Sequence, residues 1–569
     1  MNQQTRTRQL RLVKTGMHTR CLLAFLPIAL LASFASVQLW GQVAMGGITG
    51  TVKDSTGAVI SGAQVKLTNV STNVIQSTVS TSSGTYVFNS VPVGTYTLRV
   101  DAPGFKTYVE KGIQVHIQNI VTADVQLAVG SVNQSVTVTS AATLLQAQDA
   151  SLGQTVPEVS VNDLPLNGRN WFSLAQISAG AIAPSGSSPD SANQLWANGV
   201  NQNQVDYRLN GIDDNIEVFD SGANGQVGSV APVPDAIQEF KLQEGDNSAE
   251  FGQFTGSVVN AVVKSGTNQL NGDAWEYLRN QALNANDYFN KQNNVPRQKY
   301  VQNQFGGTIG GPVMLPKLYN GRNKTFFFFD YQRTNVTQQA SFTDTIPTNS
   351  MRNSGYSNLQ DLIAGNSGSN TDALGRTFAH GTVLDPATTR AVPAGARDPI
   401  SGLTNTTNST VYVRDPFYNC TSSSCPAANY QAGGPLTGIT DFTTAGQEGR
   451  LNIIPAARFD PNAVALLKLL PAPNVTGTVL RNNYYVVPAA TQYTNQYDVR
   501  IDENISAKDM LWGVYSRSHQ NLASYQPFPG IAGGALGIAP NDDEPHYELA
   551  LHYTHVFSPT FENDMSGGV

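Results

Sequence analysis

Carboxylates gather in one short stretch of the sequence and form the first group of residues that could do chemistry. The group comprises Asp206, Asp213, Asp214, Glu217 and Asp220. Ca²⁺ prefers carboxylate oxygens, but this spacing lacks the alternating oxygen ligands and the terminal Glu of an EF-hand loop. A calcium site and a solvated acidic loop both remain open, and the spacing favours the solvated loop.

The histidines and glycines match no catalytic motif. His552 and His555 lie in a strand-like segment together with His546. Their spacing in a strand places His552 and His555 on opposite faces, which argues against a shared metal. The run Gly306-Gly-Thr-Ile-Gly-Gly311 is too short for a dinucleotide loop and lacks the Gly-Lys-Ser/Thr of a P-loop. The sequence therefore predicts no catalytic, cofactor or metal site and no enzyme.

The N-terminus resembles a secretory signal. Basic residues precede the apolar run from Cys21 to Ala32, and no acidic residue occurs before Asp54. An apolar run of about a dozen residues is short for a membrane span and is typical of a signal peptide. We expect residues 1–41 to be a signal peptide cleaved near Ala35 or Gly41; an uncleaved anchor is the alternative.

Two cysteines remain beyond the expected signal peptide, Cys420 and Cys425, in a polar turn. In an exported protein such a pair indicates a local disulfide that stiffens a loop. A metal pair is the alternative, but no histidine and no second cysteine pair accompanies them.

The composition excludes two broad classes of protein. Lys and Arg number 34 and Asp and Glu 41, so the net charge is −7, and only 13% of residues are charged. An ordinary soluble domain has about 25% charged residues. The hydrophobic share of 40% is enough for a core, which excludes wholesale disorder. No cationic surface is available for binding nucleic acid.

Residues 46–128 alternate between apolar and polar positions, with turn residues at short intervals, which predicts a β-sandwich. Gly50-Thr-Val-Lys-Asp54, Gly84-Thr-Tyr-Val-Phe88 and Pro103-Gly-Phe105 resemble the carboxypeptidase regulatory-like domain, a prealbumin-like, carbohydrate-binding-like fold. The resemblance implies an accessory module without peptidase activity, and it leaves sugar binding open. We expect His116 to be a solvated strand residue. The module's aromatic residues are expected in its core: Tyr86, Phe88 and Tyr96.

Residues 129–264 carry a different series of motifs. Leu164-Pro-Leu-Asn-Gly-Arg169 leads into a short amphipathic stretch, and a turn is expected at Asn210-Gly211. The late strand Ala236–Leu242 is followed by a closing motif, Glu250–Lys264. This order resembles the plug of TonB-dependent outer-membrane receptors. The resemblance predicts an α+β plug.

From residue 265 to 569, strand patterns are separated by long polar loops. Trp275 and Tyr277 alternate with Ala274, Glu276 and Leu278, and a Phe-rich strand follows at residues 324–333. This pattern is typical of transmembrane β-strands, which have about 9–11 residues and aromatic girdles. Residues 334–485 show little regular pattern and are expected to be extracellular loops.

These motifs, with Ile454-Pro-Ala-Ala-Arg-Phe-Asp-Pro461 and Tyr497-Asp-Val-Arg-Ile-Asp502, resemble the Oar-type branch of TonB-dependent transporters. The resemblance implies a mainly β protein in the bacterial outer membrane, whose 22-stranded antiparallel β-barrel encloses a plug. The plug and the N-terminal domain would lie on the periplasmic side.

The same resemblance implies partners and no cofactor. The TonB–ExbB–ExbD complex would pull on a short box, for which Ser135, Val136, Thr137, Val138 and Thr139 are candidates; a strand of the linker is the alternative. Outer-membrane lipid would surround the barrel. An extracellular solute such as an oligosaccharide, a peptide or a siderophore would be taken up. The loops are poor in charge, which favours a neutral or sugar-like ligand.

Two other interpretations remain. The chain could be an adhesion or structural protein anchored by its barrel, or a carbohydrate-binding surface receptor without transport. After residue 264 the sequence leaves room for about five or six recognisable strands, far short of 22. We therefore expect an N-terminal part of a longer protein with an incomplete barrel.

Overall fold

The computed structural model describes fourteen ranges of the chain. Four sequence predictions lie outside them: the signal peptide, its cleavage near Ala35 or Gly41, the Cys420–Cys425 disulfide, and the positions of Glu217 and Asp220. The described residues are 45–131, 135–139, 152–182, 196–199, 204–215, 230–245, 251, 256–286, 288–292, 296–418, 437–443, 451–476, 480–528 and 541–569.

Two small sheets pack face to face near the N-terminus and form the N-terminal sandwich. Tyr86, Phe88 and Tyr96 are buried in its core, as predicted. Gly50 allows a close approach of chains, because a Cβ there would lie 2.0 Å from the carbonyl oxygen of Ala123. One sheet contains β1 (Gly46–Asp54), β4 (Thr85–Val91), β7 (Ile120–Thr122) and β8 (Val125–Leu127). The other contains β3 (Ile75–Val79), β2 (Gln64–Asn69), β5 (Gly94–Asp101), β6 (Thr107–Val115) and β9 (Ser135–Thr139).

A second unit, the central domain, is built on a five-stranded mixed sheet. Trp171 stacks on Phe172 with ring centroids 4.0 Å apart and packs against Phe240, which anchors the short helices on this sheet. The predicted turn at Asn210-Gly211 is confirmed, and both residues have positive φ. The strands are β10 (Leu152–Pro157), β15 (Ile237–Gly245), β16 (Val258–Val263), β13 (Asp206–Leu209) and β14 (Ile212–Asp213), with a separate pair β11 (Ala181–Ile182) and β12 (Trp196–Ala197). The helices are α2 (Glu158–Asp163), η1 (Asn167–Arg169), η2 (Trp171–Ile177) and η5 (Pro234–Ala236).

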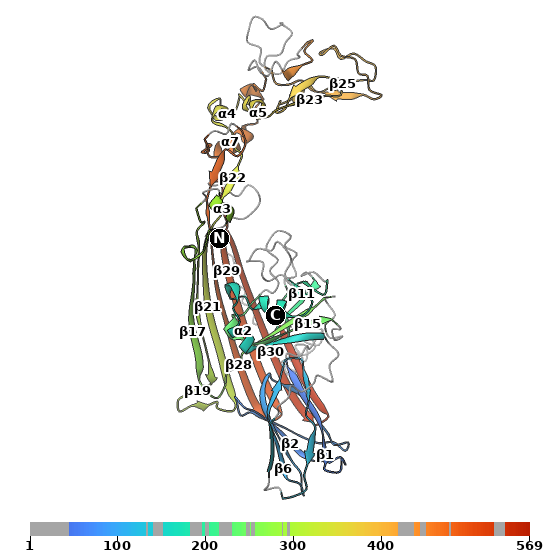
Figure 1. Ribbon diagram of the computed structural model, residues 1–569, viewed down its shortest axis with the longest axis vertical. Helices are drawn as coiled ribbons and strands as arrows, with labels where there is room; N and C mark the ends of the chain where they lie inside the picture. Colours follow the sequence, from blue (N-terminus) through green and yellow to red (C-terminus); the bar gives the residue numbers. More distant parts are fainter. Residues whose placement is uncertain are drawn as a thin grey trace, which may run out of the picture.

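Seven strands form one long antiparallel sheet, each paired with the next along the chain. The sheet is open, with β17 and β31 at its two edges. In Figure 1 the central domain lies against one face of this long sheet, and the N-terminal sandwich lies at its lower end. The strands are β17 (Asn271–Asn280), β18 (Tyr300–Pro312), β21 (Thr325–Gln339), β28 (Ala489–Ser506), β29 (Asp509–Ala523), β30 (Asn541–Ser558) and β31 (Phe561–Gly568).

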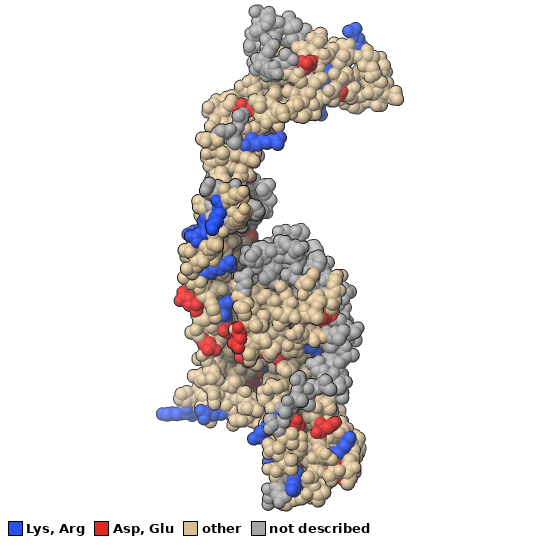
Figure 2. All heavy atoms as spheres, in the orientation of Figure 1, with Lys and Arg blue, Asp and Glu red and all other residues tan. Residues whose placement is uncertain are grey.

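The two faces of the long sheet differ in chemistry. The face toward the central domain, the inner face, carries buried polar side chains such as Gln304, Gln332 and Gln496. The outer face carries exposed apolar side chains such as Phe329 and Leu551. This alternation is the one expected of a membrane barrel wall. Charged side chains are also sparse over the part of the surface in view in Figure 2.

The described residues between 342 and 486 form an arm that extends beyond the upper end of the long sheet (Figure 1). In its described residues, which are expected to be extracellular loops, irregular stretches connect short hairpins and helices. They are too short to show a period in the sequence, and buried ion pairs join them. Arg376 is 1% exposed and its Nη1 lies 2.6 Å from Asp415 Oδ1.

The same network continues through Arg390, which pairs with Asp398 at 2.6 Å and with Asp415 at 2.8 Å. Burial opposes ionisation of Asp398, but hydrogen bonds from Arg390 and Ser401 outweigh it and lower the pKa of Asp398. The arm contains β22 (Phe342–Asp344), β23 (Ser369–Thr371), β24 (Thr377–Ala379), β25 (Arg390–Val392), β26 (Val411–Val413) and β27 (Tyr484–Val486). Its helices are α4 (Asn349–Asn353), α5 (Asp361–Ala364), η7 (Pro386–Thr388), η8 (Ala456–Arg458) and α7 (Pro461–Leu469). Connections near the long sheet contain η6 (Gln281–Leu283), α3 (Tyr288–Gln292), β19 (Met314–Leu315) and β20 (Tyr319–Asn320).

The glycine run at residues 306–311 lies within β18 and lets the Trp275 ring and a neighbouring strand approach closely. A Cβ at Gly306 would lie 2.2 Å from Tyr331 O and 2.8 Å from Trp275 Cζ2. We expect Gly306→Val to lower the free energy of unfolding by about 1–3 kcal/mol through overpacking. Gly310→Ala is the control, because its nearest atom would be 3.1 Å away on a side chain. Thermal unfolding followed by circular dichroism measures both, and equal effects would contradict this explanation.

Candidate functional site

The central domain is held against the inner face of the long sheet by a buried arginine. Arg500, on β28, donates from Nη1 to the carbonyl oxygen of Val263 at 2.6 Å, at the end of β16. Its guanidinium also pairs with Asp502 at 2.8 Å and lies 4.3 Å from the ring centroid of Trp512. Asp502 accepts a second bond, from Ser265 Oγ at 2.8 Å. These contacts fix the end of the central domain where the chain enters the long sheet.

A second arginine makes the reverse contact, from the central domain to the sheet. Arg169, in the Leu-Pro-Leu-Asn-Gly-Arg motif, lies over the rings of Trp275 and Tyr277, with centroid distances of 5.0 and 4.5 Å. It also forms an ion pair with Asp235 and donates to Gln332 Oε1 at 3.3 Å. Trp275 and Tyr277 thus share the inner face, which confirms their predicted common side.

A third contact involves one of the histidines singled out in the sequence. His552 is buried on the inner face, 2.9 Å from the carbonyl oxygen of Asn210 through Nε2, and its ring stacks on Trp512. His555 lies on the opposite face, with Nδ1 2.6 Å from Asp509 Oδ1. The predicted placement of these two histidines on opposite faces is confirmed.

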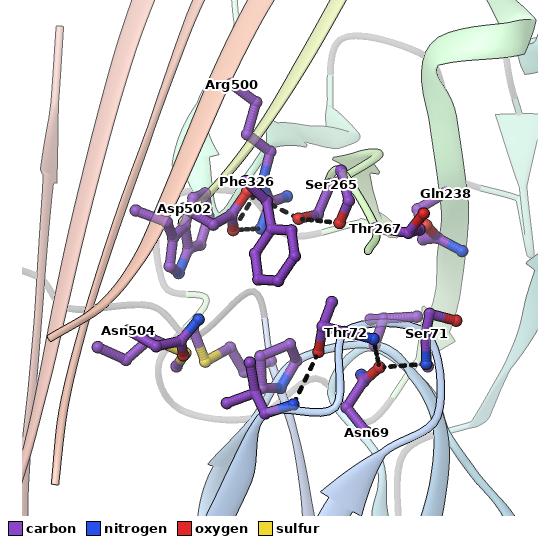
Figure 3. Close-up of a pocket in the computed structure, with 18 of the residues that line it drawn as sticks. Asn69, Ser71, Thr72, Gln238, Ser265, Thr267, Phe326, Arg500, Asp502 and Asn504 are labelled. Atoms are coloured by element: carbon purple, nitrogen blue, oxygen red, sulfur yellow. Dashed lines mark hydrogen bonds and ion pairs between the residues drawn. The ribbon is translucent and has the colours of Figure 1, made fainter. Parts of the chain in front are cut away.

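The sandwich, the central domain and the long sheet meet around a cavity of about 150 Å³. Figure 3 shows Asn69 and Thr72 of the sandwich facing Phe326, Arg500 and Asp502 across this cavity. Direct bonds flank it. The backbone N–H of Asn268 donates to Ser71 O at 3.1 Å, and Ser90 Oγ donates to Asp564 at 2.9 Å.

The sandwich also bonds the central domain directly, which corrects the expectation that His116 is solvated. His116 Nδ1 lies 2.8 Å from Glu239 Oε2, and the backbone N–H of Ile117 donates to the other carboxylate oxygen. Lys241 Nζ donates to Gln118 O at 3.0 Å. The hydrogen bond with Glu239 raises the pKa of His116, and its effect exceeds that of burial. The single sequence gave no sign of this contact, because Glu239 is 123 residues away.

The candidate box residues form strand β9, which pairs in parallel with β6 at the edge of the sandwich. Ser135 is opposite Thr107, and Thr139 is opposite Lys111. The side chains of Val136 and Val138 are 40% and 39% exposed. The segment therefore forms an edge strand of the sandwich, and in the sequence it precedes the central domain.

A second cavity, of about 230 Å³, lies on the arm side of the contact between the central domain and the sheet. Arg169 and Trp171 line it from the central domain. The sheet contributes hydroxyl and amide side chains from neighbouring strands and one histidine: Gln332, Thr334, Thr494, Gln496, Ser518, Gln520 and His546. Such a wall offers many hydrogen-bond donors and acceptors and little net charge.

Of the five carboxylates singled out in the sequence, Asp206, Asp213 and Asp214 have described positions, and two of these three are buried. Asp206 is buried and pairs with Arg208 at 2.8 Å, and burial raises its pKa despite that partner. Asp214 is buried and accepts a bond from Val230 N, whereas Asp213 is exposed. Among the residues with described positions, no three His, Cys, Asp or Glu side chains converge as a metal site. No helix within the described ranges combines the length and apolar character that crossing a bilayer requires.

Comparisons with known proteins agree with this architecture. Residues 262–569 match the outer membrane beta barrel domain, and residues 47–128 match the carboxypeptidase regulatory-like domain. Because the first match covers more than half of the chain, the chain belongs to the outer membrane β-barrel family. The expected location in the outer membrane is thereby confirmed.

One relative is similar to part of this chain and bears on its type of outer-membrane protein. The chain is 24% identical over 266 residues to the TonB-dependent transporter Oar of Myxococcus xanthus, which covers 46% of this chain and 24% of the relative. With the two domain matches, this likeness supports the expected resemblance to Oar-like TonB-dependent receptors. The chain spans about a quarter of the relative's length.

Solved structures resemble only a small part of the chain. A cohesin–X-dockerin complex of Acetivibrio cellulolyticus is 22% identical, with 15% of this chain and 58% of that chain covered and a TM-score of 0.13. The pilus 2b backbone protein of group B streptococcus is 18% identical, with 15% and 42% covered and a TM-score of 0.12. Neither likeness bears on function.

The His116–Glu239 pair predicts a pH dependence of the contact between the sandwich and the central domain. Because the pKa of His116 is raised, its stabilising contribution is complete below the ordinary pKa of about 6.5 and is lost as the pH rises through the raised value. We expect Glu239→Gln to return the pKa of His116 toward 6.5 and to abolish this dependence. Glu244→Gln, on the same strand, is the control. NMR titration of the His116 ring and urea unfolding against pH measure both effects, and an unchanged His116 titration would refute the assignment.

The contact through Arg500 predicts a stability effect that depends on the shape of the guanidinium. Lysine keeps the charge but lacks the planar fork, so it cannot bond Val263 O and Asp502 together. We expect Arg500→Lys to cost about 1.5–3 kcal/mol and to make the central domain more sensitive to protease. Arg517→Lys, on the outer face of β29, should change neither. Equal protease sensitivity of the two variants would show that the Arg500 contact does not hold the domain.

Proposed function

We propose that the protein takes up a bulky solute across the outer membrane, driven by the TonB–ExbB–ExbD complex. The observation that carries the proposal is the placement of the central domain against the polar inner face of the long sheet, held by side-chain contacts such as those of Arg500, Arg169 and His552. In this proposal the central domain is the plug, and its displacement opens the route. The likeness to a TonB-dependent transporter supports it.

We further propose that force enters at Ser135–Thr139. This strand lies at an edge of the sandwich with exposed side chains, and in the sequence it precedes the central domain. Tension on this strand would act on its neighbour β6. His116 follows directly after β6 and bonds Glu239 on β15, so the force would reach the central domain. Neutral hydrogen bonds contribute only about 0.5–1.5 kcal/mol each, so contacts such as that of Gln304 with Gly168 O can be exchanged for water as the domain moves.

The solute is proposed to enter from the arm side. The cavity of about 230 Å³ there has a mostly uncharged hydroxyl and amide lining, which supports a neutral, hydrogen-bonding solute such as an oligosaccharide or a peptide. A siderophore is the further alternative. The expected signal peptide and the Cys420–Cys425 disulfide remain part of the proposal, since export and an oxidising compartment are required.

A second candidate function is adhesion or surface binding without transport. The ordered arm favours it, because buried ion pairs give this segment a defined shape beyond the sheet.

Uptake and binding by whole cells separate the two functions. In a strain lacking TonB, we expect uptake of the solute to be lost while surface binding persists. Val136→Pro should have the same effect, because proline removes a backbone donor and disturbs a strand, and Val136→Ile should retain uptake. Unchanged uptake without TonB would refute transport, and unchanged uptake in Val136→Pro would refute the assigned box.

A further inference from the structure

Acidic side chains form a row across the inner face of the long sheet, at the level where the central domain covers it. Asp330 on β21 is directly opposite Asp498 on β28, and Asp498 is opposite Ser516 on β29. Ser516 in turn is opposite Glu548 on β30. Directly opposed side chains on neighbouring strands have Cβ atoms about 5 Å apart. The row is therefore a continuous strip of oxygen atoms.

This row is buried and lacks well-formed hydrogen bonds. Asp330, Asp498 and Ser516 are 0% exposed, and Glu548 is 3% exposed. By distance and angle, neither the six carboxylate oxygens nor the Ser516 hydroxyl makes a hydrogen bond among the described residues, although Asp498 lies close enough to interact with both Asp330 and Ser516. Buried polar atoms are normally paired, and buried charges are costly unless they are compensated. An ionisable group at this depth is a functional site by default.

The nearest cations are already engaged. Lys264, which acts electrostatically on Asp330, lies 2.8 Å from Glu158. Arg500, two residues along β28 from Asp498, bonds Asp502 and Val263 O. Neither arginine nor lysine therefore supplies the missing charge within the row. On the far side of Glu548, the carboxylate of Asp214 adds further negative charge.

We propose that Asp330, Asp498 and Ser516 bind a divalent cation at the contact between the central domain and the long sheet. Two carboxylates and one hydroxyl offer five oxygen atoms from three adjacent strands. Ca²⁺ accepts 6–8 oxygen ligands in flexible geometry, whereas Mg²⁺ demands a near-ideal octahedron. The side-by-side carboxylates therefore favour Ca²⁺, with water or a backbone oxygen completing the shell. Glu548 lies beyond Ser516, outside the shell, and the two aspartates alone neutralise the charge of the cation.

The buried hydroxyl of Ser516 distinguishes this site from a cluster of acidic residues alone. Its hydroxyl is fully buried, lies beside Asp498 in the sheet and interacts with that carboxylate without a well-formed hydrogen bond. A buried hydroxyl in that position is satisfied by a cation that the neighbouring carboxylates also bind. The proposal goes beyond transport, because it requires only the seated central domain.

Calorimetric titration of the full chain, purified in detergent and stripped with a chelator, tests the site. With CaCl₂ as the probe we expect one binding site, weaker binding of MgCl₂, and a higher Tm in the presence of Ca²⁺. Asp498→Asn should weaken Ca²⁺ binding about tenfold or more, since a charge-assisted ligand is lost. Ser516→Ala should weaken it less. Asp163→Asn, an exposed carboxylate on α2, is the matched control and should bind as the unaltered chain does.

A second measurement guards against a folding defect. Without Ca²⁺, Asp498→Asn removes one of two opposed buried charges, so its Tm should equal or exceed that of the unaltered chain. With Ca²⁺, its Tm should rise by much less than that of the unaltered chain. The proposal is overturned if the unaltered chain binds neither cation at millimolar concentration. That result is expected if Asp330 and Asp498 share a proton instead of binding a cation. It is equally overturned if Asp498→Asn keeps the full Ca²⁺-induced rise in Tm. Neither outcome involves uptake, so the result is independent of the transport proposal.

Discussion

The hydrogen bond from the buried guanidinium of Arg500 to Val263 O is the contact on which the arrangement of the chain depends. Val263 ends the last strand of the central domain, and Ser265, two residues later, bonds the partner of Arg500, Asp502. One side chain of the long sheet thus fixes both the end of the central domain and the point where the chain turns toward β17. Lys264, between them, pairs with Glu158 at 2.8 Å and fixes the same point from the other side. The position of the central domain against the sheet follows from this constraint.

Several other contacts on the inner face also join side chains of the sheet to backbone atoms of the central domain. Gln304 donates to Gly168 O, Gln496 to Ala231 O, and His552 bonds Asn210 O. Side chains that bond carbonyl groups recognise the shape of turns rather than particular side chains. When the central domain moves away, water can replace such neutral hydrogen bonds on the inner face. The apolar side chains of the outer face form no hydrogen bonds that water could replace. The sheet therefore holds the central domain in a defined position while leaving it separable.

Much of the fold could be predicted from the sequence, because alternation is strong where strands have one buried face. The sandwich core at Tyr86, Phe88 and Tyr96, the turn at Asn210-Gly211 and the shared face of Trp275 and Tyr277 all follow from period and turn chemistry. The contacts between units could not be predicted. His116 meets Glu239 only after the sandwich docks, and Arg500 meets Val263 over 237 residues of sequence. Period-two spacing puts Arg500 and Asp502 on the same face of β28, but a single sequence does not say what lies opposite.

The arm shows why low periodicity is a poor measure of order. Its hydrophobic clusters are small, one built on Phe378, Tyr418, Phe442 and Leu451 and another on Leu374, Val392 and Val413. Such cores cannot define a shape alone, and the buried Arg376–Asp415–Arg390–Asp398 network supplies the missing constraint. Buried ion pairs add little net stability, yet breaking one leaves an uncompensated charge, so competing packings are excluded. In a chain with only 13% charged residues, this concentration of charge acts to fix geometry. A segment ordered before binding loses less entropy when it captures a solute, which fits the proposed entry of the solute from the arm side.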